Sequence, residues 1–261
     1  MNLAPTTSGA TDAPWPVPET ALVLGGGIFR NAFQVGALEA LHRRGFRPQL
    51  VIGVSSGAWN GACLVAGQID QMRRFWEVVA RLPKVSLRNA AVNRTLFNIR
   101  SIIREIPEAE LDFGAIARSR TRFLVGATQL SNLRFRLLEL NSRPGVEVFA
   151  GLMASNLIPG VVGWPVRFSE KRYIDGGFTN RVPYAAALDA GARQVIVVVP
   201  DGEMIHRPRP GSRRQQPPEP RHLDAPTIVA PRRRLAKPGG GPRHIADAID
   251  EGLAVGLEVP L

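Results

Sequence analysis

The sequence has little cysteine and no long hydrophobic run, and each absence excludes a class of protein. A single cysteine, Cys63, excludes an internal disulfide framework. No run approaches the roughly 20 apolar residues that a membrane-spanning helix needs. Residues 1–20 lack the basic start and apolar core of a secretory signal, and their prolines disfavour a helix. We therefore expect a cytoplasmic protein whose contact with a membrane, if any, is peripheral.

Signatures of nucleic-acid binding are also absent, although the charge is strongly positive. The 261 residues carry a formal net charge of +11. From Asp201 to Ile245 there are ten Lys and Arg against four Asp and Glu, a net of +6. This stretch lacks aromatic side chains on which bases could stack, and no zinc-finger or RNA-recognition motif occurs. We expect no nucleic-acid partner, and the basic stretch favours peripheral contact with an anionic lipid surface.

Composition divides the chain into four stretches. Residues 1–19 are rich in Pro, Thr and Ser and predict a disordered N-terminal segment. Residues 20–200 carry the regular apolar patterns of one folded domain. Residues 201–244 are rich in Pro and Arg and predict a flexible segment. Residues 245–261 predict a C-terminal helix that packs back on the domain.

The patterns within the domain predict an α/β fold. The apolar run 21–24 ends in three glycines, as a buried parallel strand does, and apolar residues recur at helical spacing over 31–44. A second strand at 50–52 and a second helix at 56–65 follow, an order typical of a parallel sheet. Further strands are expected at 123–127, 133–140, 172–174 and 195–199, and further helices at 71–80, 147–155 and 183–190.

A serine on a strand-to-helix turn is the first candidate for chemistry. Gly53-Val54-Ser55-Ser56-Gly57 matches G-x-S-x-G between an apolar strand and a helix. Its glycines permit the tight turn, and the helix N-terminus directs N–H groups towards the reacting centre. The same pentapeptide also suits an ordinary turn between a strand and a helix. Ser55 is therefore a candidate nucleophile that needs support from other residues.

A glycine run supplies a second element. Gly25-Gly26-Gly27, followed by Arg30, forms a nest of backbone N–H donors that can hold an anion, such as the oxyanion of acyl transfer. A P-loop would need Gly-Lys-Ser/Thr after four further residues, which does not occur. A dinucleotide fingerprint would need glycine in place of Arg30 and an acidic residue near Ile52, and both are lacking. Nucleotide binding is therefore disfavoured.

The third element is Asp175-Gly176-Gly177, which follows a strand-like stretch. A glycine turn can hold an aspartate so that its carboxylate accepts the proton of a serine hydroxyl. Alone, Asp-Gly-Gly is equally typical of a plain turn.

In this order, the three elements resemble the patatin-like phospholipase family in its bacterial form. That form opens with G-x-G-x-x-R-G, which 25–30 fit until Asn31 replaces the last glycine. Residues 53–58 and 175–177 correspond to the nucleophile and base positions of the family. Two further family segments are similar to Ala154-Ser155 with Pro159 and to Asn180 with Pro183. The resemblance covers roughly residues 20–200.

The resemblance implies a three-layer α/β/α fold with a mostly parallel central sheet. It implies a Ser–Asp dyad, with Ser55 as nucleophile and Asp175 as base, and neither a metal nor an organic cofactor. The implied activity is hydrolysis of acyl esters of lipids, of the phospholipase A or lysophospholipase type or as a general esterase.

The resemblance also assigns roles to the glycine-rich loop. The N–H groups of Gly26, Gly27 and Ile28 would form the oxyanion hole beside Gly25. Arg30 would orient this loop or meet a phosphate headgroup.

Two alternatives remain open. Ser55 and Asp175 could belong to a Ser-Asp-His triad, whose histidine would be His206, His222 or His244. These histidines lie in or beside the Pro/Arg-rich stretch, where a base is poorly held. The fourth histidine, His42, precedes the nucleophile.

The other alternative is a non-catalytic module on the same fold that binds a lipid or a protein. The bulky Ile28 and Phe29 and the replacement by Asn31 favour it, whereas the intact Ser55 and Asp175 oppose it.

Overall fold

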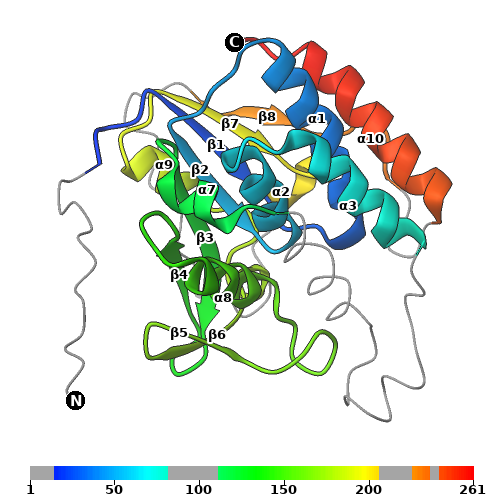
Figure 1. Ribbon diagram of the computed structural model, residues 1–261. Coiled ribbons are helices and arrows are strands. Elements are labelled where there is room, and N and C mark those ends of the chain that lie inside the picture. The colour runs from blue at the N-terminus through cyan, green and yellow to red at the C-terminus, as the bar shows by residue number, and fades with distance from the viewer. Residues whose placement is uncertain (1–14, 82–110, 206–224, 236–240) are drawn as a thin grey trace, which may run out of the picture.

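The computed structural model describes residues 15–81, 111–205, 225–235 and 241–261 (Figure 1). Their strands form one mixed sheet of eight strands, in the order β5-β6-β3-β2-β1-β7-β8, with β4 paired to β3 outside this path. The five parallel strands are β1 (Thr20–Leu24), β2 (Leu50–Val54), β3 (Arg122–Gln129), β7 (Gln194–Val198) and β8 (Thr227–Val229). The antiparallel ones are β4 (Arg134–Glu139), β5 (Val166–Phe168) and β6 (Lys171–Asp175).

Helices cover both faces of this sheet, unequally. The core on one face lies under α1 (Ala32–Arg43), α2 (Ser56–Val65), α3 (Ile69–Arg81), α7 (Phe113–Arg118), α8 (Gly145–Asn156) and α10 (Pro242–Leu257). The other core lies under α9 (Tyr184–Asp189). Short 3₁₀ turns are η1 (Ile28–Asn31), η2 (Gly176–Phe178) and η3 (Gly202–Ile205). The expected three-layer α/β/α fold is thus confirmed.

The local patterns explain why these elements form. Strands β1, β2 and β7 are almost wholly buried, as expected for central parallel strands that carry continuous apolar runs. Helix α3 has the opposite character, because only Met72, Trp76, Val79 and Ala80 are buried along one stripe. None of the helices within the described residues has both the length and the apolar character required to cross a membrane.

The C-terminal helix α10 packs against α1, far from it in the sequence (Figure 1). Glycines allow this contact: a Cβ on Gly36 would overlap the carbonyl of Ile249, and a Cβ on Gly252 would overlap that of Phe33. The backbones of α1 and α10 therefore touch directly at these glycines. Helix α10 runs from Pro242 to Leu257 and overlaps the stretch 245–261, for which a helix is expected.

Described residues lie within both stretches for which disorder or flexibility is expected. Within 1–19, the Glu19 carbonyl accepts the Gln194 N–H of β7 at 2.9 Å, and the Trp15 indole donates to the Glu139 carboxylate of β4. Within 201–244, β8 pairs with β7, because its short apolar run completes the sheet edge. The rest of these two stretches, at 1–14, 206–224 and 236–240, lies outside the described residues.

The strand register determines where the site lies. Strand β2 runs parallel to β3 and its last residue, Val54, pairs with Gly126. Strand β6 runs antiparallel to β3 and its last residue, Asp175, pairs with the next residue, Ala127. The carboxyl ends of β2 and β6 therefore meet head to head along β3. The residue after β2 and the last residue of β6 are brought together by this arrangement.

Candidate active site

Ser55 occupies a strained turn between β2 and α2. Its backbone angles are φ 55° and ψ −133°, in a region that few residues other than glycine adopt. The flanking glycines are required sterically. A Cβ on Gly53 would lie 2.6 Å from the Cα of Ala58, and one on Gly57 would lie 2.5 Å from the Leu24 carbonyl oxygen. This is the geometry of a nucleophile elbow.

The Ser55 hydroxyl donates a hydrogen bond directly to the Asp175 carboxylate. The distance from Oγ to Oδ2 is 2.7 Å, and the two residues are 9% and 4% exposed. The candidate nucleophile and the candidate carboxylate base therefore touch without an intervening group. The two candidates, 120 residues apart in sequence, are brought together as the motifs predict.

The Asp175 carboxylate is oriented by its own turn. Its Oδ1 accepts the N–H of Gly177 at 2.6 Å, which leaves Oδ2 directed at Ser55. The backbone is held as well, because the Asp175 carbonyl accepts the Thr128 hydroxyl at 2.9 Å. A Cβ on Gly176 would overlap the Gly126 carbonyl, so only glycine allows the turn to pack on β3.

Ser155 on α8 supports the strained turn from the other side. Its Oγ accepts the Ser55 N–H at 3.0 Å and donates to the Gly126 carbonyl at 2.6 Å. The side chain is fully buried. The sequence marked Ser155 only as part of a family-like segment. Its role, like that of Thr128, depends on contacts between distant elements that no local pattern signals.

The glycine loop lies against the nucleophile. A Cβ on Gly26 would come within 3.2 Å of the Ser55 Cβ. However, the Gly26 N–H donates to the Arg181 carbonyl at 3.0 Å, so the fold already uses one of the three donors expected for an oxyanion. Within the described residues, the N–H groups of Gly27 and Ile28 make no hydrogen bond. These two remain candidates for oxyanion donors.

Asn31 holds the glycine loop in place. Its Nδ2 donates to the Gly25 carbonyl at 2.7 Å and to the Ser56 hydroxyl at 2.8 Å, and the residue is fully buried. The residue that departs from the family pattern therefore links the loop to the start of α2. Arg30 forms an ion pair with Asp201 at 3.6 Å, which ties the loop to the end of β7.

A buried polar chain behind the loop was missed by the sequence analysis. Gln34 Nε2 donates to the carbonyls of Gly25 and Val198, both at 2.9 Å. Its Oε1 accepts Asn60 Nδ2 at 2.9 Å, and Asn60 Oδ1 accepts Trp76 Nε1 at 2.9 Å. Buried polar groups are stable when each has a partner. The sequence did contain a signal for this buried chain, because the polar residues Gln34 and Asn60 interrupt the apolar faces of α1 and α2.

Histidines do not contact the nucleophile in the part of the chain that the structure describes. The side chain and N–H of Ser55 bond to Asp175 and Ser155. His42 lies at the end of α1, where burial and the charge of Arg47 lower its pKa. His244 is exposed at the start of α10, and the triad candidates His206 and His222 lie outside the described residues.

Other reactive groups lie apart from the site. Burial raises the pKa of the Cys63 thiol to about 12, as expected for an inert core cysteine. Among the described residues, no group of three or more His, Cys, Asp or Glu is arranged to hold a metal.

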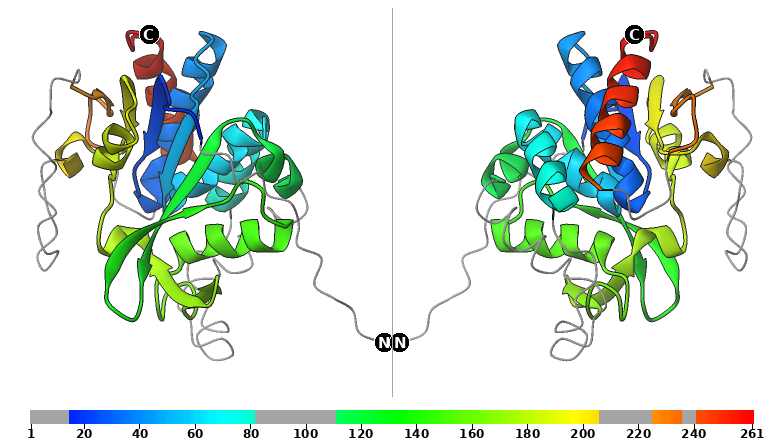
Figure 2. Two further views of the ribbon diagram at one scale, coloured as in Figure 1. Left: turned by 90° about the vertical axis from the view of Figure 1, so that its left-hand side faces the viewer. Right: turned by 90° about the vertical axis from the view of Figure 1, so that its right-hand side faces the viewer.

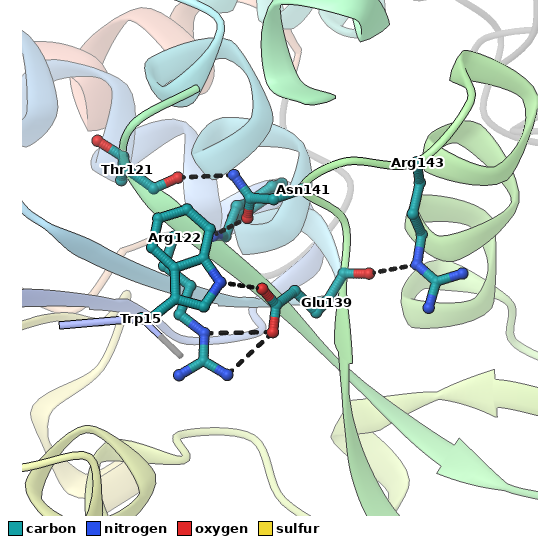
Figure 3. A network of polar contacts seen from close by, with 7 residues as sticks. Trp15, Thr121, Arg122, Glu139, Asn141 and Arg143 are labelled. Carbon is teal, nitrogen blue, oxygen red and sulfur yellow. Dashed lines mark hydrogen bonds and ion pairs between the residues drawn. The ribbon is translucent and has the colours of Figure 1, made fainter. Parts of the chain in front are cut away.

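A cavity of about 860 Å³ lies at the amino-terminal ends of β2 and β3, whereas Ser55 follows the carboxyl-terminal end of β2. Arg122 and Asn141 line it, and Glu139 accepts hydrogen bonds from Trp15 and Arg122 beside it (Figure 3). The Arg122 guanidinium pairs with the Glu139 carboxylate, and Arg143 donates to the Glu139 carbonyl at 2.8 Å.

Comparisons with known proteins find a matching family and distant relatives. The model of the family "Patatin-like phospholipase" matches residues 22–188. The chain is 26% identical over 186 residues to the lysophospholipase NTE1 of Scheffersomyces stipitis, covering 68% of this chain and 11% of that protein. It is 25% identical to the probable lipid hydrolase 463L of Invertebrate iridescent virus 6, covering 64% of this chain and 62% of that one. The chain thus spans less than two thirds of these relatives.

A solved structure is similar in fold. VipD from Legionella pneumophila superposes with a TM-score of 0.55 at 12% identity, covering 93% of this chain and 66% of that chain. At 12% sequence identity, this similarity supports only a common fold. The family match, in contrast, includes both the Ser55 and the Asp175 motifs. The chain belongs to the patatin-like phospholipase family.

Proposed function

We propose that the protein hydrolyses acyl esters of lipids, with Ser55 as nucleophile and Asp175 as the only catalytic base. The observation that carries the proposal is the hydrogen bond of 2.7 Å from Ser55 Oγ to Asp175 Oδ2, at the end of a nucleophile elbow. The family and the names of its relatives, a lysophospholipase and a probable lipid hydrolase, support lipids as the substrate class.

The reaction follows from the contacts of these two residues. Ser55 Oγ attacks the ester carbonyl while Asp175 Oδ2 takes its proton, and the tetrahedral intermediate forms. Asp175 then gives this proton to the departing alcohol, which leaves an acyl-serine. Water, deprotonated by the same carboxylate, attacks the acyl group, and the fatty acid leaves as Ser55 regains its proton.

The developing oxyanion needs donors beside Ser55. The N–H groups of Gly27 and Ile28, which bond to none of the described residues, are supported in this role by the contact of Gly26 with Ser55. Asn31 and Gln34, which bond to the Gly25 carbonyl, hold the loop so that these donors are oriented before the substrate binds.

The substrate type that we propose is a phospholipid or lysophospholipid, with short esters also accepted. Ile28 in the glycine loop and Phe178, three residues after Asp175, are 42% and 41% exposed and could offer apolar contact to an acyl chain. We further propose that the basic stretch 201–244 keeps the protein near anionic lipids by electrostatic attraction.

Ester hydrolysis by designed variants tests the catalytic proposal. Wild type, Ser55→Ala and Asp175→Asn would be compared on a short p-nitrophenyl ester and on a phospholipid. We expect each variant to lose about 10³-fold or more of kcat, because the nucleophile and its base act as one unit. Asp189→Asn, an exposed carboxylate at the end of α9, is the matched control and should keep full activity.

Labelling by a fluorophosphonate separates the alternatives. An activated Ser55 is labelled in the wild type and not in Ser55→Ala. Equal behaviour of the wild type and both variants in every assay would replace the proposal with the binding-module alternative. A labelled and active Asp175→Asn variant would instead indicate a different base.

A further inference from the structure

Two hairpins extend the sheet beyond the candidate active site. They are the β3–β4 turn with the start of β4, residues 130–136, and the approach to β5 with the β5–β6 hairpin, residues 164–172. In Figure 1 they lie at the end of the molecule away from α1 and α10, and Figure 2 agrees. We call residues 130–136 and 164–172 the hairpin surface.

The hairpin surface is cationic. It contains five Arg and Lys and one acidic residue, Glu170, which forms an ion pair with Arg167. Within the described part of the chain, no carboxylate lies within ion-pair distance of Arg134, Lys171 or Arg172. Most of this positive charge is therefore left without a counter-charge among the described residues.

The strand register places part of this charge in one row. Arg172 on β6 lies directly opposite Arg167 on β5, and the Leu130 N–H donates to the Arg172 carbonyl at 2.9 Å. Residues that pair across strands share a face, so the two guanidinium groups project from the same side. Like charges opposite each other are unfavourable in a sheet. Glu170 already pairs with Arg167, so the charge that an anionic partner would balance is that of Arg172.

Large apolar side chains accompany the charge. Leu133 is 63% exposed, Trp164 is 61% exposed, and Leu130 at the β3–β4 turn is 38% exposed. Cations beside exposed Trp and Leu fit a lipid surface, because the cations meet headgroups while Trp and Leu enter the interface. A nucleic acid would satisfy the arginines but not the leucines.

The hairpin surface adjoins the site. Arg172 precedes Asp175 by three residues on β6, which is about 10 Å along a strand. Docking through this surface would hold the entrance of the site close to the lipid.

We propose that the hairpin surface docks the protein on an anionic lipid surface. The inference rests on the proposed function for the kind of partner, and it assigns a contact to residues of the sheet in addition to the basic stretch 201–244.

Vesicle co-sedimentation in the inactive Ser55→Ala background tests this inference without reference to catalysis. The vesicles are phosphatidylcholine alone, or phosphatidylcholine mixed with phosphatidylglycerol. The triple variant Arg167→Gln/Lys171→Gln/Arg172→Gln should bind the mixed vesicles about tenfold more weakly or worse, since each cation near an anionic surface contributes to binding. The control with the same charge change is Arg118→Gln/Arg120→Gln/Arg193→Gln, located where β3 and β7 begin. It should bind as the parent does.

A second pair of variants tests the apolar part. Trp164→Ser should weaken binding to the mixed vesicles severalfold, and the loss should persist at high salt. Leu257→Ser, which changes a residue 52% exposed at the end of α10, should leave binding unchanged. Circular dichroism and thermal melting would establish that each variant is folded.

Several results would overturn the inference. These are full vesicle binding by the triple variant, equal loss in the triple variant and its charge control, and a stronger, equally variant-sensitive binding to duplex DNA than to vesicles. Failure of the proposed function is separate. The triple variant with Ser55 intact should hydrolyse a soluble p-nitrophenyl ester at the wild-type rate, and absence of that activity in the wild type would refute catalysis but not docking.

Discussion

Ile28 stands in the glycine loop with φ 52°, a left-handed backbone conformation. For a β-branched residue this conformation is an outlier, because the side chain crowds the neighbouring backbone. Such strain costs roughly 1–3 kcal/mol and persists only where the surroundings impose it. In this loop the constraint comes from the buried side chains of Asn31 and Gln34, which hold the loop by hydrogen bonds to the Gly25 carbonyl. The loop therefore retains its shape at the expense of stability.

Replacement of Ile28 by glycine should relieve this strain. We expect Ile28→Gly to raise the free energy of unfolding by about 1 kcal/mol, because the strain relieved exceeds the entropy that glycine adds to the unfolded chain. Urea denaturation measures the change. The control is Val146→Gly at an exposed position of α8, which should lower stability by about 1 kcal/mol. A loss of stability in Ile28→Gly equal to that of the control would contradict the account of strain.

At the scale of elements, the contact between α1 and α10 depends on the absence of side chains. Gly36, Gly252 and Gly256 occupy the points where the two helices touch. Helix α1 also carries Gln34, which supports the glycine loop. Helix α10 therefore supports, through α1, the glycine loop beside Ser55.

A methyl group at this contact should separate the helices. We expect Gly252→Ala to lower the free energy of unfolding by about 1–3 kcal/mol, the usual effect of overpacking. Thermal or urea unfolding would measure it. Gly202→Ala is the control, because a Cβ there would meet only Ala230 at 3.6 Å, an ordinary contact. If both variants unfold like the wild type, the close contact does not limit packing.

For the whole molecule, the net charge of +11 is unevenly distributed. A net of +6 lies between Asp201 and Ile245, and the hairpin surface contributes a further excess of cations. Electrostatic attraction to an anionic surface acts over about a Debye length and falls with salt. Two separate basic regions should then add to the attraction of the protein to such a surface.

The contribution of the basic stretch can be measured by itself. Neutralising Arg207, Arg209, Arg213 and Arg214 to Gln should weaken binding to vesicles containing phosphatidylglycerol severalfold at low salt, and less at high salt. Activity on a soluble ester should not change. Vesicle binding equal to that of the wild type at every salt concentration would remove this stretch from the proposal.

Much of the fold could be predicted because its elements have strong local patterns. The apolar runs at 21–24 and 195–199 correspond to β1 and β7, and the helical spacing over 31–44 to α1. Elements with weak patterns were missed. Strands β5 and β8 have three residues each, too few to show a period, and they form because a neighbouring strand offers a free edge.

Some parts of the candidate site could be predicted from the sequence, and others could not. The glycine turns around Ser55 and Asp175 could be predicted, since tight turns impose glycine on the sequence itself. The oxyanion donors could not be predicted fully. Whether the Gly26 N–H is free depends on the Arg181 carbonyl, which lies far away in sequence.

The sequence by itself determined the family, the order of the central elements and the two reactive turns, because each is encoded by neighbouring residues. Only the tertiary structure decided that Ser55 and Asp175 touch. That contact requires β6 to run antiparallel to β3, so that its end meets the end of β2 between Gly126 and Ala127. Strand direction and register are determined by packing and pairing across the whole sheet, and no local pattern contains them.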